Sequence, residues 1–473
     1  MIILRVSIRI LVAGFICMML IVPSNIDASV LSAQDDITGI AFLPGSGGRV
    51  LFNQTYGPGE FHSILELQNG DLAIVGCSNR NATLFPSTGE LIEDSDIFLM
   101  KTDSSGNTIW SHSYDFSEEY GSLLWIGYEV IQTNDMGFVV VGNAGNQVFL
   151  LRTDMNGNTL WMKAFGGWGA TLGRGVVELE DEGFLVIGST YVIGYGYSLY
   201  MARTDSSGNM MWVRSYEGST ETYGNSIIRL DSGRLLIAGY TERAYDTEML
   251  VICTNLLGDI IWYRTYGFGR GESIIGTKVG NLVFIGHGNE YEPYGGNSGI
   301  HLIHTDLNGN VTQSRTYSGV PYRDLPNHFG DFSYAFVEDG NGGYYITGET
   351  WTGDPKLVED GRFNEALLLH INRQGDVDKS YTYGSVHHKD GGYDILKTVS
   401  GAIAIVGYRG NANQESTWEN VAESWLLIVL LNEQEPSPAG TVFAGATILA
   451  IIGILQVQSK KQSKKLKSMK SQN

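Results

Sequence analysis

The stretch FLMKTDSSGNTIW (98–110) decides the fold, because close copies of it return along the chain. The copies are LLRTDMNGNTLW (150–161), MARTDSSGNMMW (201–212) and VICTNLLGDIIW (251–262). In each copy an apolar segment runs to a Thr, an Asp-x-x-Gly or Asn-x-x-Gly turn follows, and a second segment ends on Trp. Gly accepts a positive φ without steric cost, so the pattern predicts two antiparallel strands joined by a tight hairpin.

Two further anchors extend this hairpin to a longer repeat. An aromatic residue recurs about every 51 residues, at Tyr56, Tyr114, Phe165, Tyr216, Tyr266, Tyr317 and Tyr383. A short apolar run that ends in Gly recurs as well, with its last residue at Gly76, Gly142, Gly188, Gly239, Gly286, Gly348 and Gly407. A run this short and continuously apolar indicates a strand buried on both faces.

Each repeat therefore predicts four short strands, and seven such units predict an all-β fold, a seven-bladed β-propeller over residues 49–432. Residues 49–56 match the fourth strand of a unit, yet they precede every other strand. The last unit ends on its third strand, at 424–431. We expect the N-terminal strand to complete the seventh blade and close the ring, which removes open sheet edges.

The hairpin motif Asp103-x-x-Gly106-x-x-x-Trp110 resembles the tryptophan-docking motif of quinoprotein-type (PQQ-like) propeller repeats, with one residue fewer between Asp and Gly. The motif recurs at Asp154/Gly157/Trp161 and at Asp205/Gly208/Trp212. The whole unit is similar to propeller repeats of secreted archaeal and bacterial proteins. This resemblance implies the fold. Quinone-dependent members of the family use a vicinal Cys pair, which this sequence lacks, so we expect no cofactor.

No pattern in the sequence indicates a metal site or a catalytic set. The segment 154–158, Asp-Met-Asn-Gly-Asn, has its Gly at the fourth position, whereas a calcium-binding EF-hand loop needs Gly at the sixth. A repeated hairpin turn explains this segment, and we expect no metal. No Gly-x-Ser-x-Gly motif marks a nucleophile, so the catalytic residues stay unassigned.

The two ends of the chain indicate export and a membrane anchor. Arg5 and Arg9 precede an apolar run, and small residues follow that run near Ala28. This pattern predicts a secretory signal peptide over 1–28. The uncharged segment 439–457 would extend ~28 Å as a helix, enough to cross the hydrocarbon core. Six lysines follow, so the positive-inside rule predicts a single-pass protein of the cell membrane, with the basic tail 458–473 in the cytoplasm and the propeller outside. Linkers are predicted over 29–48 and 433–438.

The charge of the chain divides along the same lines. The formal net charge is −20, and removing the six tail lysines and the single net positive charge of the leader leaves −27 on the rest. An acidic body repels a phosphate backbone, which excludes nucleic acid as a partner. Cys77 and Cys253 fall in apolar strands three repeats apart and are not expected to form a disulfide.

The longest insertions between strands fall on one face of the predicted propeller, at 79–95, 318–330, 350–364 and 409–423. Connections of this kind carry function on a rigid frame. Aromatic rings and carboxylates on them suit sugars or peptides, because rings stack on apolar sugar faces and carboxylates accept hydroxyl or ammonium hydrogens. The candidates on this face are Trp351, Asp354, Trp418, Tyr195, Tyr245 and Tyr291, with Tyr191 and Tyr197 in the same loops as Tyr195. Asn81 in the first insertion is the glycosylation candidate.

A second candidate site is a ring at the mouth of the predicted central channel. Two residues before the centre of each first strand, the side chain differs from unit to unit while the flanking residues agree. These residues are His62, Tyr128, Arg174, Asn225, Glu272, Phe332 and Tyr393. Such a mixed polar ring either binds a small ligand or ion, or is unselected channel lining.

The sequence favours a membrane-anchored extracellular propeller that acts as a non-catalytic binding module for a cell-surface protein or glycan. Two alternatives stay open. One is an extracellular polysaccharide-acting enzyme, a glycoside hydrolase or lyase that would use two converging carboxylates. The other is a structural component of the cell envelope.

Overall fold

The computed structural model describes residues 48–84, 91–122, 124–166, 169–216, 220–243, 246–277, 280–288, 298–317, 328–352, 363–384, 389–410 and 422–431. The predicted signal peptide, membrane segment and basic tail lie outside these residues. Within the described part of the chain, no helix is long and apolar enough to cross a membrane.

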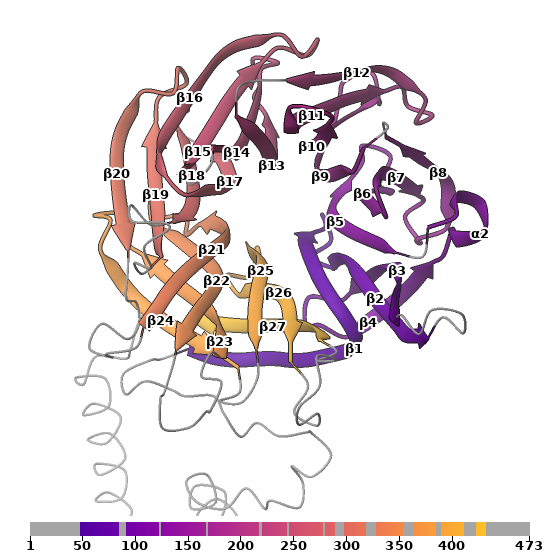
Figure 1. Cartoon of the computed structure of the whole chain (residues 1–473). Helices are drawn as coiled ribbons and strands as arrows, with labels where there is room; N and C mark the ends of the chain where they lie inside the picture. Colours follow the sequence, from indigo (N-terminus) through magenta and orange to yellow (C-terminus); the bar gives the residue numbers. More distant parts are fainter. Residues whose placement is uncertain are drawn as a thin grey trace, which may run out of the picture.

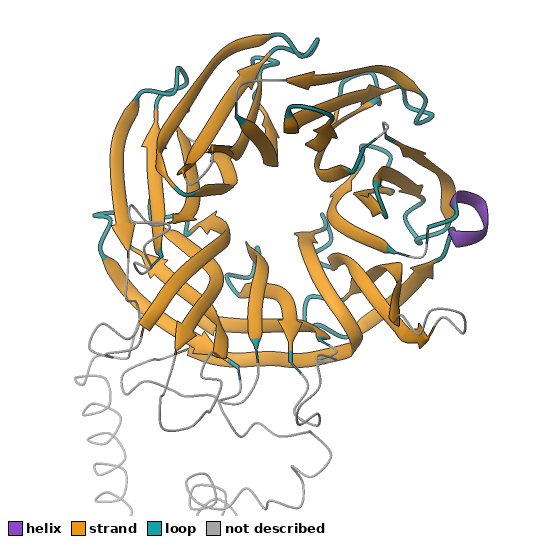
Figure 2. Ribbon diagram, in the orientation of Figure 1, coloured by secondary structure: helices purple, strands orange, loops and turns teal. Residues whose placement is uncertain are grey.

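The described chain is almost entirely β-structure, and its sheets stand around a common axis as in a β-propeller (Figures 1 and 2). A single helical turn, α2 (Ser117–Tyr120), lies on the outside of the ring. Five sheets have four antiparallel strands each. Their strands are β5 (Trp125–Gln132), β6 (Phe138–Ala144), β7 (Gln147–Thr153) and β8 (Thr159–Phe165); β9 (Thr171–Glu178), β10 (Phe184–Val192), β11 (Gly196–Thr204) and β12 (Met210–Tyr216); β13 (Glu221–Arg229), β14 (Leu235–Arg243), β15 (Asp246–Thr254) and β16 (Ile260–Phe268); β17 (Arg270–Gly276), β18 (Leu282–Gly288), β19 (Gly299–Thr305) and β20 (Val311–Tyr317); and β21 (His328–Glu338), β22 (Tyr344–Thr352), β23 (Phe363–Ile371) and β24 (Val377–Tyr383).

The sixth sheet has seven strands, in the order β25-β26-β27-β1-β2-β3-β4. These strands are β25 (Asp390–Lys397), β26 (Ile403–Arg409), β27 (Glu423–Leu431), β1 (Gly48–Glu66), β2 (Leu72–Leu84), β3 (Leu91–Thr102) and β4 (Thr108–Tyr114). The described chain therefore forms six sheets, not the seven separate sheets expected. The difference arises because β1 pairs with β27 as far as Pro58 and with β2 from Gly59 onward, so no unpaired residue divides the two ladders.

The first strand of each repeat lies nearest the axis (Figure 1). Neighbouring inner strands contact one another in the order β1, β5, β9, β13, β17, β21 and β25, and β25 contacts β1. The two ends of the described chain meet in the same place, where the ladder between β1 and β27 runs from Gly48 opposite Leu431 to Pro58 opposite Glu423. Residues 49–56 thus pair with 424–431, as the sequence indicates. Across this ladder the indole Nε1 of Trp425 donates to Asn53 Oδ1 at 2.6 Å.

The apolar runs that end in Gly form the second strand of each unit and supply much of the core. Their side chains are buried, as Val139, Leu185 and Leu236 show with no exposed surface, and they pack against the neighbouring sheets. The terminal Gly of each run is required by close backbone approach. A Cβ on Gly76 would lie 1.9 Å from the carbonyl oxygen of Glu60 on β1.

The predicted hairpins dock each sheet onto the next one. In the turn that begins at Asp154, the carboxylate accepts the backbone N–H of Asn158 at 2.9 Å. The hydroxyl of Tyr114, on the preceding sheet, donates to the carbonyl of Gly157 at 2.6 Å, and the ring of Trp110 lies against the same Gly. The equivalent hydroxyl-to-carbonyl hydrogen bonds between sheets are Tyr216 to Gly258, Tyr266 to Gly309 and Tyr317 to Gly375, and the bond from Tyr56 to Gly106 lies within the seven-stranded sheet.

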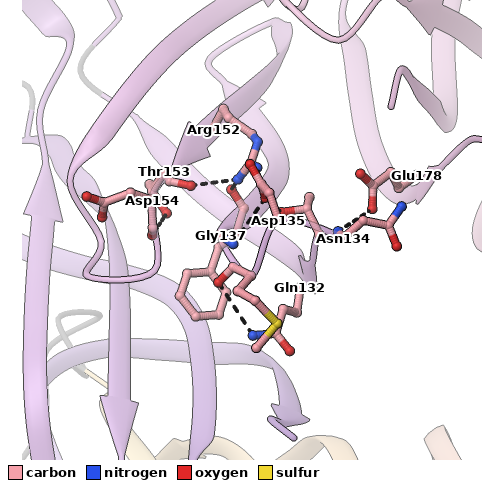
Figure 3. A network of polar contacts seen from close by, with 11 residues as sticks. Gln132, Asn134, Asp135, Gly137, Arg152, Thr153, Asp154 and Glu178 are labelled. Atoms are coloured by element: carbon pink, nitrogen blue, oxygen red, sulfur yellow. Dashed lines mark hydrogen bonds and ion pairs between the residues drawn. The ribbon is translucent and has the colours of Figure 1, made fainter. Parts of the chain in front are cut away.

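A cation on the third strand holds the turn between the first two strands. Arg152 is 6% exposed, and its Nη1 donates to the carbonyls of Phe138 and Thr153 at 3.0 and 2.6 Å, while Nη2 pairs with the Asp135 carboxylate (Figure 3). The next sheet joins this network, because the Glu178 carboxylate accepts the backbone N–H of Asn134 at 2.9 Å. The corresponding pairs in other units are Lys101 with Asp71, Arg203 with Asp181, and His370 with Asp339.

Candidate functional site

One bulge in each inner strand sets the geometry of the candidate site. Opposite the end of the second strand, the ladder skips one residue of the first strand in every unit. A bulge leaves its extra residue out of the ladder and re-aims that side chain. The skipped residues, which we call the bulge ring, are His62, Tyr128, Arg174, Asn225, Glu272, Tyr334 and Tyr393.

Six of the seven residues predicted for the channel mouth belong to this ring, and Phe332 does not. In β21 it is Ser333 that lies opposite Gly348, so Tyr334 is the residue skipped. The sequence alignment of this unit was wrong by two positions, because it placed Tyr334 at the buried centre of the strand. Phe336, which is 4% exposed, fills that position.

Aromatic rings contact one another along one side of the bulge ring. The imidazole of His62 lies between the rings of Tyr128 and Tyr393, with centroids 4.9 and 5.0 Å away. Tyr393 in turn contacts Tyr334, at 5.4 Å and close to a right angle. Burial lowers the pKa of His62 to about 3, and the charge of Arg174 acts in the same direction. The imidazole is therefore neutral at physiological pH.

Charged and amide groups make up the other side of the bulge ring. Asn225 Nδ2 donates to the Glu272 carboxylate at 3.0 Å, and the imidazole Nδ1 of His287 lies 3.9 Å from the other carboxylate oxygen. Burial raises the pKa of Glu272 to about 7, against the opposing effects of Arg174 and Arg270. The Glu272 side chain is nevertheless 18% exposed, so the site reaches solvent.

A second tier of polar residues, missed at the sequence level, packs behind the bulge ring. Each follows the Gly that ends a second strand, and the four with large polar side chains are Tyr240, His287, Glu349 and Tyr408. The Glu349 carboxylate is buried and accepts the hydroxyl of Tyr408 at 3.0 Å and Asn364 Nδ2 at 2.5 Å. The available signal was the variable residue directly after an otherwise constant Gly.

Four tyrosines connect the β10–β11 hairpin to the second tier. Tyr191 and Tyr197, on the β10–β11 hairpin, have ring centroids 5.4 Å apart, and Tyr197 lies 5.3 Å from Tyr223 on β13. Tyr223 stacks on Tyr240 of β14 at 4.5 Å with an interplanar angle of 15°. We call these four residues the tyrosine path. Arg270 ends the path, with its guanidinium 5.0 Å from the Tyr240 ring centroid.

Two carboxylates beside the bulge ring join inner strands of neighbouring units. Glu129 Oε2 accepts the backbone N–H of Val176 at 2.6 Å, and Asp394 Oδ2 accepts that of Ile64 at 2.8 Å. Burial raises the pKa of Glu129 to about 8 and that of Asp394 to about 6. These carboxylates hold the strands that carry the site.

The remaining predicted residues have different outcomes. Tyr195 lies between β10 and β11 and is 58% exposed. Trp351 belongs to β22, opposite Asn364, and the structure describes only its backbone. Asp354, Trp418, Tyr245 and Tyr291 lie outside the described residues. Asn81 is in β2, not in a loop as expected, because β2 and β3 stay paired as far as Leu84 opposite Leu91.

The chemistry of this arrangement favours binding. Tyrosine rings, guanidinium donors and partly exposed carboxylates are groups that can contact a ligand through stacking and hydrogen bonds. In the described part of the chain, no three His, Cys, Asp or Glu side chains are grouped so that they could hold a metal ion. Cys77 and Cys253 are buried thiols in separate sheets.

No protein-family model matches the chain, and no curated protein matches its sequence. Among solved structures, the chain is similar to the WD40 domain of Neurospora crassa Pan2, at 9% identity and a TM-score of 0.44, over 82% of this chain and 96% of that one. It is also similar to Drosophila Plexin A in complex with Semaphorin 1b, at 7% identity and a TM-score of 0.46, over 82% and 88%. A third similar structure is the NanB sialidase of Streptococcus pneumoniae, at 9% identity and a TM-score of 0.42, over 87% and 73%.

Proposed function

We propose that this protein is a non-catalytic binding module that recognises a cell-surface protein or glycan. The observation that carries the proposal is the tyrosine path, which runs from the β10–β11 hairpin to Tyr240 of the second tier and on to Arg270, across three sheets. Tyr191 is 43% exposed at the outer end of the path. A row of aromatic faces that ends in charged groups suits a ligand with apolar faces and polar edges, as sugars have.

The proposal includes the placement of the module. The predicted signal peptide, the apolar segment 439–457 and the six lysines after it support an extracellular propeller held by one membrane helix. The two ladders of β1 support seven four-stranded units, with β1 shared by the first and the last. The contact of Trp110 with the Gly157 turn supports kinship with the PQQ-like repeats, without their quinone site.

The test uses the full chain in detergent, applied to a glycan array and to solubilised surface proteins. We expect the double variant Tyr197→Ala/Tyr223→Ala to bind its partner roughly ten-fold more weakly or worse, because each lost aromatic contact is worth about 0.5–1.5 kcal/mol. Tyr263→Ala is the matched control, since Tyr263 is 66% exposed on the outer strand β16. Full binding by the double variant would contradict the proposal.

The loop residues named from the sequence, Trp351, Asp354, Trp418, Tyr245 and Tyr291, are proposed to extend the same binding surface. Deleting 352–362 and 411–420 together is the corresponding variant. It should weaken partner binding while the melting temperature stays within a few degrees of the parent.

The elevated pKa of Glu272, about 7, favours one alternative, a polysaccharide-acting enzyme in which Glu272 is a general acid. Product analysis of bound polysaccharides distinguishes the binding module from the enzyme. If the parent cleaves a polysaccharide and Glu272→Gln does not, the protein is an enzyme and the proposal of a non-catalytic binding module is wrong.

A further inference from the structure

Two arginines, Arg174 of the bulge ring and Arg270 at the inner end of the tyrosine path, hold their guanidinium groups without a protein acceptor. Arg174 on β9 lies 4.0 Å over the ring of Tyr128, and Arg270 on β17 lies 5.0 Å over that of Tyr240. Among the described residues, neither guanidinium makes a hydrogen bond or an ion pair. Arginines elsewhere in the ring do find carboxylates, as the pairs Arg152–Asp135, Arg203–Asp181, Arg229–Glu180 and Arg315–Asp376 show.

The strands of the two arginines are joined by β13, which contacts both β9 and β17, and Asn225 of β13 donates to the Gly271 carbonyl and to the Glu272 carboxylate, each at 3.0 Å, beside Arg270. In keeping with this placement, the charges of Arg174 and Arg270 both lower the pKa of Glu272 and that of Tyr240, although burial, the larger effect, raises each. Arg270 is exposed and Arg174 is half-buried. Each guanidinium lies over a tyrosine ring, and a guanidinium presents a fork of N–H donors that matches a carboxylate.

We propose that Arg174 and Arg270 bind the carboxylate of an acidic sugar within an oligosaccharide whose neighbouring rings stack on the tyrosine path. This inference rests on the proposed function and narrows it to carboxylate-bearing glycans of the uronic-acid type. The tyrosine path leads to Arg270, because Tyr191, Tyr197, Tyr223 and Tyr240 follow one another with centroids 4.5–5.4 Å apart and Arg270 lies over the last ring.

The charge of the whole chain restricts the ligand further. A net charge of −20 repels a dense polyanion, whereas the arginine pair acts locally, within the ~10 Å over which charges are felt at 0.1 M salt. An oligosaccharide with isolated carboxylates therefore fits better than a continuously charged polymer. Glu272 opposes binding of a ligand carboxylate, because the Glu272 carboxylate is itself attracted to Arg174 and Arg270, whose charges lower its pKa.

The test pairs each carboxylate-bearing oligosaccharide on an array with its neutral counterpart, in which the uronic acid is replaced by the parent hexose. With the full chain in detergent, we expect the acidic members to bind at least ten-fold more tightly. Arg174→Met and Arg270→Met should each remove this preference. Glu272→Gln keeps an acceptor for Asn225 and should strengthen the preference several-fold.

Arg214→Met is the matched control, because Arg214 also lies over an aromatic ring, that of Trp212, but on the outer strand β12. Its preference should equal that of the parent. A melting temperature measured for each variant separates loss of the site from loss of the fold, and exposed Arg270 gives the cleaner result.

Three outcomes would overturn the inference. Equal binding of acidic and neutral members would show that the tyrosine path binds glycans without the arginines, which leaves the proposed function intact. Retention of the preference in both arginine variants would place the carboxylate elsewhere. Binding of a surface protein with no glycan bound would also contradict the inference while the binding module stands.

Discussion

The hydroxyl of Tyr114 shows how single atoms hold neighbouring sheets together. It is buried and donates to the carbonyl of Gly157 in the hairpin of the next sheet, at 2.6 Å. Gly157 has a φ of +82°, and a Cβ there would lie 2.5 Å from the His112 ring, so the turn admits no other residue without strain. The sheets are therefore joined through backbone groups whose position the turn fixes.

We predict that Tyr114→Phe lowers the free energy of unfolding by about 1 kcal/mol, because the Gly157 carbonyl loses a donor in a buried place. Denaturant unfolding measures this change. The unit with Phe165 offers the reciprocal variant, since this position lacks the hydroxyl by nature. Phe165→Tyr should stabilise the protein, by less than about 1.5 kcal/mol. A Tyr114→Phe variant as stable as the parent would show that the hydroxyl contributes nothing.

At the scale of the strand, β1 belongs to two ladders. Deleting residues 48–58 removes the part of β1 that pairs with β27, so β27 becomes an open sheet edge. We predict a lower melting temperature and more aggregation than in the parent, measured by thermal scanning and light scattering. Asn53→Ala is the milder variant, because it removes only the acceptor of the Trp425 indole. It should cost about 1–3 kcal/mol and cause no aggregation. A deletion variant that aggregates no more than the parent and has an unchanged melting temperature would contradict this role of β1.

The hairpins and the pairing of 49–56 with 424–431 could be predicted because they depend on local or repeated patterns. The Asp-x-x-Gly turn is complete within five residues, and the unmatched first and last strands identify each other. The number of sheets could not be predicted, because it depends on whether the two ladders of β1 meet at Pro58 and Gly59.

The candidate site could be predicted only in part. Six bulge-ring residues are found by aligning the repeats, but Tyr334 and Phe336 are both aromatic, and composition alone does not decide which one is skipped. Tyr240, His287, Glu349 and Tyr408 follow buried runs, and only the bulge beside them reveals that they pack behind the ring. The tyrosine path joins β10, β11, β13 and β14, which is a property of the tertiary structure.

At the scale of the whole molecule, the axis collects groups whose ionisation opposes folding. Burial raises the pKa of Glu129 to about 8, of Glu272 to about 7 and of Asp394 to about 6. A carboxyl whose pKa is raised on folding stabilises the fold below its unfolded pKa of about 4, and this contribution is lost as the pH rises through the folded value. Folding lowers the pKa of His62 to about 3 and that of His287 to about 4. These histidines therefore stabilise the fold above about pH 6.5, and this stabilisation is lost as the pH falls toward the folded pKa values.

The parent protein should therefore lose stability between pH 5 and pH 8, by up to about 1.4 kcal/mol per pH unit for each such group. We predict that Glu129→Gln loses less stability than the parent over this range. The amide still accepts the backbone N–H of Val176, so the variant should equal the parent at low pH and exceed it at pH 8. Unfolding at a series of pH values measures the difference, with the exposed Glu118→Gln as control. Parallel curves for parent and variant would exclude Glu129 as the source.

The sharing of β1 between the first and last units also governs the order of folding. Its outer half has no partner until β27 is present, and Asn53 and Trp425 are 372 positions apart in the chain. Contacts of such separation form late and slow the overall rate. During synthesis the intermediate sheets can form one after another, whereas residues 48–58 stay unpaired until β27 has been made. The final closure is thus the step at which an incomplete chain is most exposed to misassembly.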